Sequence, residues 1–273
     1  MTQPLPHTVD TLAADLRALG LAAGDTVLVH SSLRSVGFVV GGVQAAVQAL
    51  LDVLGEDGTL VVPTHTPSNS DPEAWSNPPV PPLWWPIIRE QGPGFDPART
   101  PSEWMGVLPE TVRSWPGARR STHPQFSFAA LGPRAADIVG RQPLADGLGE
   151  GSPLGAVYRA YGKVLLLGCG HDRNTSLHLA ECRQARPPMT ADGAAVREPD
   201  GRRRWVTWTA PTADASDFAE IGAAYEAKGV VRIGEAESEG AVRIGPVGNA
   251  EARLMPQRSV VDFATDWLSR HRS

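Results

Sequence analysis

The chain has 273 residues, 41% of them hydrophobic and 20% charged, which is typical of a globular protein with one large domain over 1–273. Its net charge of −5 argues against nucleic acid as a partner, and no apolar run approaches the roughly 20 residues that span a bilayer. With no secretory signal visible and two cysteines that match no metal or redox spacing, we expect a cytoplasmic protein without a bound metal.

The first part of the chain predicts a helix, a strand, a second helix and a second strand. Leucines at helical spacing predict a helix over 9–19, and a short buried strand follows at 26–30. A polar loop separates this strand from a helix over 41–54, and the next strand is expected at 60–62. This order implies two parallel strands joined by a right-handed crossover.

Proline is dense from 67 to 101 and the regular pattern is lost there, although the tryptophans among the prolines favour an ordered loop over a linker. The further elements expected are helices over 108–115, 214–227 and 259–270, strands over 126–131 and 163–167, and a hairpin over 195–209. We therefore predict an α/β fold. Its mixed, largely parallel central sheet is flanked by helices, with a small β-hairpin and a long irregular loop inserted.

The segment GCGHDRNTSLHLAE, residues 168–181, follows the buried strand and starts a helix, with Asn174 or Thr175 as its expected cap. On that helix Thr175, His178 and Glu181 are three residues apart and share one face. Open α/β sheets bind their ligands at the carboxyl ends of strands. His178 is the natural general base, because its type titrates near neutral pH and a carboxylate can fix its tautomer.

Two other polar clusters end predicted strands, His30-Ser31-Ser32 and Thr64-His65-Thr66. Three clusters at the ends of strands in one sheet predict a shared crevice. Glycines at 41 and 42 start a helix, where exposed backbone N–H groups favour a phosphate, although many such glycines are only caps. Cys169 is a possible nucleophile, but a small residue at a strand end more often only packs.

Four blocks of sequence carry a resemblance to a known family. They are VLVHSSLRSVG (27–37), GTLVVPTHT (58–66), RSTHPQFSFAALGP (120–133) and LLLGCGHDRNTSLHLAE (165–181). In this order they resemble the aminoglycoside 3-N-acetyltransferase family, and the similarity extends from Leu12 to about Trp267. The resemblance implies acetyl transfer from acetyl-CoA to the 3-amino group of a 2-deoxystreptamine ring, as in kanamycin, gentamicin or tobramycin, and hence antibiotic resistance.

The resemblance also implies roles for individual residues. His178 is expected to be the base, oriented by Glu181 or by Asp172, with His171 as the rival base. Thr66 is expected to donate its hydroxyl to the thioester oxygen. The residues expected to bind acetyl-CoA are Ser31, Ser32, Arg34, Val40, Gly41, Gly42, Ser121 and His123. The residues expected to bind the cationic sugar are Asp71, Glu103 and Asp217, and the pair Trp84-Trp85 is either a wall of that pocket or buried under the loop.

Several alternatives stay open. Residues 191–248 depart from the family pattern, so the acceptor could be a different, non-antibiotic amine. A thioesterase-like hydrolase would use His178 with Cys169 or Ser176 as its nucleophile, although no Gly-x-Ser-x-Gly turn is present. A module that only binds a cationic drug would not need His178. We expect small-molecule partners only, neither nucleic acid nor membrane, and a monomer or homodimer.

Overall fold

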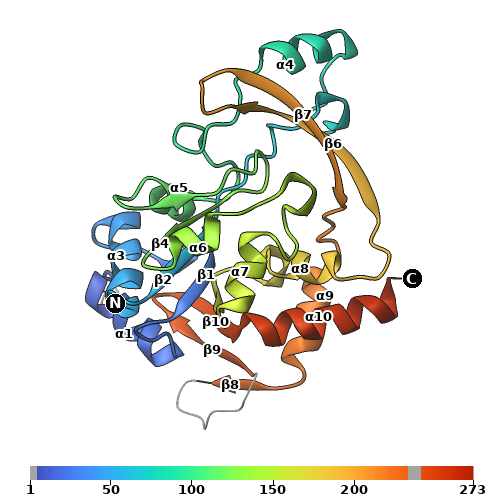
Figure 1. Ribbon diagram of the computed structural model, residues 1–273. Coiled ribbons are helices and arrows are strands. Elements are labelled where there is room, and N and C mark those ends of the chain that lie inside the picture. Colours follow the sequence, from blue (N-terminus) through green and yellow to red (C-terminus); the bar gives the residue numbers. More distant parts are fainter. Residues whose placement is uncertain (1–4, 233–240, 273) are drawn as a thin grey trace.

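The computed structural model describes residues 5–232 and 241–272. Within these ranges one sheet has the strand order β3-β4-β2-β1-β5-β10-β9-β8, and β6 and β7 form a separate hairpin (Figure 1). The sheet strands are β1 (Thr26–Ser31), β2 (Thr59–Pro63), β3 (Arg119–Arg120), β4 (Phe128–Leu131), β5 (Lys163–Leu167), β8 (Val230–Arg232), β9 (Val242–Val247) and β10 (Ala250–Pro256). The hairpin strands are β6 (Met189–Arg197) and β7 (Arg203–Pro211).

The centre of the sheet is parallel. β1 pairs in parallel with β2 on one side and with β5 on the other. Antiparallel strands flank this centre, since β4 pairs with β2 and β10 pairs with β5. The expected mixed sheet and the expected parallel pair of first strands are both confirmed. The carboxyl ends of β1, β2 and β5 consequently meet at one edge, which we call the catalytic edge.

Two layers of helices cover the sheet. The helices are α1 (Val9–Leu19), α2 (Leu33–Val36), α3 (Gly42–Leu54), α4 (Trp85–Gln91), α5 (Val107–Arg113), α6 (Ala135–Val139), α7 (Pro153–Arg159), α8 (Leu177–Cys182), α9 (Phe218–Glu226) and α10 (Gln257–His271). Short 3-10 turns are η1 (Pro72–Ala74), η2 (Pro82–Trp84), η3 (Leu144–Asp146) and η4 (His171–Arg173). Among the described residues, no helix has the length and apolarity that crossing a membrane requires.

Alternation along the buried strands builds two separate cores. In β1 the side chains of Val27 and Val29 pack with α1, α3 and α5, whereas Leu28 packs on the opposite face with residues of α6 to α10. In β5 Leu165 and Leu166 divide in the same way. Successive side chains of a strand point to opposite faces, so a continuous apolar run predicts a strand that is covered on both sides.

The structure differs from the expected elements in several places, and the short elements β3, α2, α6 and α7 are among those not expected. β8, β9 and β10 were not expected, because only the register of β10 on β5 makes these short runs recognisable as strands. The strand expected from 126 begins at Phe128, after a turn held by His123. The loop over 67–101 is ordered and contains α4, and together with the β6–β7 hairpin it projects from the body of the molecule (Figure 1).

Candidate active site

His178 and Glu181 lie one turn apart on α8 and are joined by a hydrogen bond. Nδ1 of His178 is 2.5 Å from Oε2 of Glu181, and the two side chains are 15% and 5% exposed. A carboxylate can only accept, so Nδ1 carries the hydrogen and the lone pair of a neutral ring is on Nε2. The ring of Phe218 packs against the imidazole at 4.7 Å between centroids. The shared helix face expected for these two residues is therefore present.

Glu181 also accepts from two groups outside α8. The guanidinium of Arg272 donates to Oε1, and the backbone N–H of Asp214 lies 3.2 Å from Oε1 and 3.4 Å from Oε2. Hydrogen bonds from several directions, one of them from a guanidinium, fix the position of a buried carboxylate. The orienting group of His178 is thus held in a fixed direction.

Two further histidines come to the catalytic edge, His30 at the end of β1 and His65 just beyond β2. Burial, and then the charge of nearby His178, lowers the pKa of His30 to about 3. The same two causes lead in lowering the pKa of His65 to about 3. In both rings Nε2 is buried and has no hydrogen-bond partner. Both imidazoles are consequently neutral at pH 7, beside the ring that is expected to take up the proton.

A cleft of about 660 Å³ opens at the catalytic edge, and we call it the edge cleft. It is lined by His30, Ser31, Ser32, Leu33, Arg34, Pro63, Trp104, Met105, Gly106, Val107, Leu108, Pro109, Cys169, Arg173 and Thr175. Gly168, just after β5, lets the chain pass close to α2. Its φ is 68°, and a Cβ atom on this residue would lie 2.7 Å from Cβ of Ser35. Hydroxyls, two guanidinium groups and apolar side chains suit a ligand that is both phosphorylated and partly apolar.

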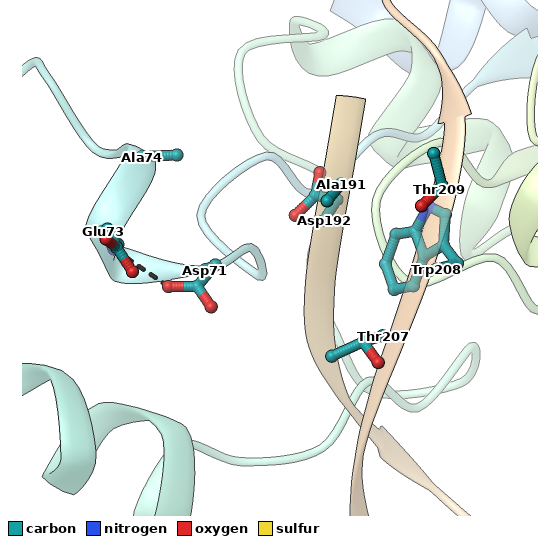
Figure 2. A pocket seen from close by; sticks show the side chains of 8 residues that line it. All are labelled: Asp71, Glu73, Ala74, Ala191, Asp192, Thr207, Trp208 and Thr209. Carbon is teal, nitrogen blue, oxygen red and sulfur yellow. Dashed lines mark hydrogen bonds between the residues drawn. The ribbon is translucent and has the colours of Figure 1, made fainter. Parts of the chain in front are cut away.

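A second concave site, the hairpin pocket, lies between η1 and the β6–β7 hairpin (Figure 2). Its volume is about 620 Å³, and its lining residues are Asp71, Glu73, Ala74, Ala191, Asp192, Thr207, Trp208 and Thr209. Three of these eight are acidic and none is basic, and Arg89 beside the pocket pairs with Asp71 at 2.6 Å and with Glu73 at 3.0 Å. One cation against two carboxylates, with Asp192 as a third, leaves the pocket with a negative charge that suits a cationic ligand. Where the hairpin meets the rest of the molecule, Trp208 packs edge-on against His123, with 5.5 Å between the ring centroids.

The fold and the residues of the catalytic edge can be compared with known proteins. A sequence model of the family described as aminoglycoside 3-N-acetyltransferase matches residues 28–269. The chain belongs to this family. One relative is the SPbeta prophage-derived aminoglycoside N(3')-acetyltransferase-like protein YokD of Bacillus subtilis (strain 168), 42% identical over 98% of this chain and 94% of that protein. Another is aminoglycoside N(3)-acetyltransferase IX of Micromonospora chalcea, 35% identical over 96% of this chain and 94% of that protein.

Solved structures of the family have the same fold. The crystal structure of YokD superposes with a TM-score of 0.89 and covers 97% of this chain and 100% of its own. The structure of AAC-IIIb in a binary complex with CoASH gives a TM-score of 0.84 at 32% identity, over 98% of each chain. The expected family and fold are thereby confirmed over nearly the whole chain.

Within this family member, Glu181 is the carboxylate that contacts His178, whereas Asp172 points elsewhere. Oδ2 of Asp172 pairs with Nε of Arg173 at 3.0 Å. The rival base His171 is buried, with Nε2 3.1 Å from Glu226. Thr66 is also fully buried, and its hydroxyl donates to the backbone oxygen of Pro124 at 2.5 Å. The structure therefore favours a turn-holding role for Thr66 over the expected contact with a thioester.

The residues expected to bind acetyl-CoA fall into three groups. Ser31, Ser32 and Arg34 line the edge cleft, as the coenzyme role requires. Val40, Gly41 and Gly42, at the start of α3, are not among its lining residues. Ser121 and His123 have internal partners: the Ser121 hydroxyl accepts from the backbone of Phe128 at 2.8 Å. His123 Nδ1 accepts from two backbone N–H groups of its own turn, and burial lowers its pKa to about 4. Both side chains thus hold the turn that leads into β4.

Of the three expected sugar ligands, only Asp71 lines the hairpin pocket, and it is also bound to Arg89. Glu103 accepts from the backbone and hydroxyl of Ser68 and fixes the loop beyond β2. Asp217 is engaged within the protein, because both of its oxygens accept from Arg272. The carboxylate that is thus occupied serves the Glu181 network better than it serves a substrate.

Three residues of these sites had no local signal in the sequence. Trp208 lies on a strand that alternation predicted, and Asp192 faces it on β6, before the expected start of the hairpin at 195, so neither position indicated a pocket. Arg272 is 91 positions from Glu181 in the chain, and only the docking of α10 beside α8 brings them together. The Trp84-Trp85 pair lies outside the hairpin-pocket lining, and Trp84 is half-exposed. Part of the departing segment, residues 233–240, lies outside the described residues.

Proposed function

We propose that this family member transfers the acetyl group of acetyl-CoA to the 3-amino group of 2-deoxystreptamine aminoglycosides, with His178 as the general base. The observation that carries the proposal is the 2.5 Å bond from His178 Nδ1 to Glu181 at the catalytic edge. His178 lies one turn beyond Thr175, which lines the edge cleft. The relative crystallised with CoASH supports coenzyme A as the carrier of the acetyl group.

The chemistry needs little beyond positioning and a proton acceptor, because a thioester is already activated. The amine nitrogen attacks the thioester carbon, and its proton passes to Nε2 of His178 as the C–N bond forms. The C–S bond then breaks, and the leaving sulfur of coenzyme A takes this proton from Nε2 of His178, which returns the imidazole to its neutral form. Glu181 stabilises the imidazolium that exists between these steps, and it keeps Nε2 aimed away from the helix. Proton transfer by such a base contributes about 10²- to 10⁴-fold to the rate.

The edge cleft is our candidate for the coenzyme site. Arg34 supplies positive charge for phosphates, as does Arg173, which also pairs with Asp172, and Ser31 and Ser32 supply hydroxyl groups near the end of β1. Cys169 also lines the cleft, and burial raises the pKa of its thiol to about 11. A thiol this hard to ionise is a poor nucleophile, which disfavours the hydrolase alternative. Ser176 is fully buried and its hydroxyl accepts from Gln257, so it is disfavoured for the same role.

The hairpin pocket is our candidate for part of the acceptor site. Aminoglycosides are polycations, and Glu73 and Asp192 place carboxylates on opposite walls of the pocket (Figure 2). Trp208 offers an indole face for a sugar ring between them. From Trp208, ring contacts continue through His123 and Phe126 to His65 at the catalytic edge.

The test is a thiol-release assay with acetyl-CoA and a panel of aminoglycosides, with the acetylated nitrogen located by NMR. We expect release that depends on the drug, and acetylation at N3. Release without any amine would indicate a thioesterase, and acetylation of only non-antibiotic amines would change the acceptor. His178→Ala should lower kcat about 10²- to 10⁴-fold. The matched control is His7→Ala, because His7 bonds Asn249 outside the site and should be dispensable for turnover.

A further inference from the structure

Arg272, the residue that follows α10, binds three acidic or carbonyl groups with one guanidinium. It donates to Oε1 of Glu181, to the backbone oxygen of Asp214 at 2.6 Å, and to both oxygens of Asp217 at 2.7 and 2.5 Å. These partners come from α8 and from the turn before α9. The guanidinium therefore ties α8, α9 and α10 together next to the proposed base.

Glu181 depends on this arginine more than an exposed carboxylate would. Its side chain is only 5% exposed, and its other partners are a neutral backbone N–H and an imidazole. A buried charge without a full counter-charge is strongly disfavoured, and a carboxyl in that position takes up a proton or moves toward water. Either event would remove the acceptor that fixes His178 Nδ1.

The two oxygens of Glu181 have different partners, so Arg272 fixes the orientation of this carboxylate and also balances its charge. Oε1 is held by Arg272, whereas Oε2 is held by His178 at 2.5 Å. With one oxygen anchored, rotation about the terminal bond of Glu181 is blocked and the second oxygen stays on the imidazole. The bonding pattern is a chain from Asp217 through Arg272 and Glu181 to His178.

We propose that Arg272 is a positioning residue of the acetyl transfer, which acts through Glu181 to hold His178 in the Nδ1–H tautomer. Asp217 orients the guanidinium of Arg272 by accepting two hydrogen bonds from it. With two carboxylates and one guanidinium, the cluster of Glu181, Asp217 and Arg272 has a net charge of −1. That remaining charge favours the imidazolium formed during turnover. The inference rests on the proposed role of His178 as the base.

The test compares Arg272→Gln, Arg272→Lys and the control Arg270→Gln. Arg270 is a neighbouring exposed arginine of α10, and it donates to the backbone oxygen of Asp266 at 3.0 Å, away from Glu181. We expect Arg272→Gln to lower kcat about 10- to 100-fold, the usual cost of losing a partner that orients a functional side chain, with the KM for acetyl-CoA within about twofold. Arg272→Lys should recover part of the loss, and Arg270→Gln should match the wild type.

A direct readout is the position of the imidazole proton, seen by long-range ¹H–¹⁵N NMR of histidine-labelled enzyme and assigned with His178→Gln. We expect the Nδ1–H form in the wild type and in Arg270→Gln, and a mixture of tautomers in Arg272→Gln. This spectrum needs no turnover, so it tests the inference even if the base is another residue. Wild-type kcat and an unchanged tautomer in folded Arg272→Gln would overturn the inference and leave Arg272 a stabilising contact only. If Arg272→Gln does not fold, the Lys variant decides between the same two outcomes.

Discussion

Lowering the pH from 7 to 5 should destabilise the folded protein through His30. This ring is 5% exposed at the end of β1, and burial, helped by the charge of His178, lowers its pKa to about 3. In the unfolded chain a histidine titrates near pH 6.5. Between these two values the unfolded state binds a proton that the folded state does not, so stability falls as the pH falls below 6.5. From pH 7 to pH 5 this linkage amounts to about 2 kcal/mol for one histidine.

Urea unfolding at pH 7 and pH 5 measures this loss directly. We expect His30→Gln, which cannot titrate in this range, to lose about 2 kcal/mol less than the wild type between the two pH values. Leu28→Ala is the control from the same strand, since Leu28 is fully buried and carries no titrating group. It should cost about 2–5 kcal/mol at both pH values and keep the wild-type pH dependence. A His30→Gln protein with the wild-type pH dependence would refute the reasoning, because His30 would then protonate in the folded state.

Three further variants test the assignment of the two clefts by initial-rate kinetics and thermal unfolding. Trp208→Ala should raise the KM for the aminoglycoside about tenfold and leave that for acetyl-CoA unchanged, whereas Trp84→Ala, outside the pocket, should change neither. Arg34→Gln should raise the KM for acetyl-CoA about 3- to 10-fold with little change in kcat, and an unchanged KM would remove Arg34 from the coenzyme site. His123→Ala leaves the backbone N–H of buried Gln125 and that of half-buried Phe126 without their acceptor and should cost about 2–4 kcal/mol of stability. A large rise in the KM for acetyl-CoA in His123→Ala, with stability intact, would instead restore its expected coenzyme role.

Much of the candidate site could be predicted because its signals are local. The bond between His178 and Glu181 follows from a spacing of three residues on one helix. The placement of His30 and Ser31 beside that helix follows from buried apolar runs, which predict parallel strands whose ends meet. Family resemblance then indicated the reaction, and the family match confirmed it.

Contacts between distant segments could not be predicted in this way. The sequence offered both Glu181 and Asp172 as the carboxylate that orients His178. The structure distinguishes them, because Asp172 in η4 pairs with Arg173 whereas Glu181 contacts His178. Asp217 looked like a free carboxylate at a helix start until α10 placed Arg272 against it. Thr66 was likewise expected to end a strand, but it follows the end of β2 at Pro63, and its hydroxyl donates to the backbone oxygen of Pro124.

The sequence by itself indicated the longer helices, the central strands, the family and a candidate base, because periodicity and short-range spacing fix which groups share one face of one element. Only the tertiary structure decided what each charged group pairs with. An ion pair such as that of Arg272 with Glu181 forms when packing brings two elements together and excludes water, and its energy depends on that burial. No local pattern encodes such burial, so the network that fixes the direction of His178 is a property of the packed fold.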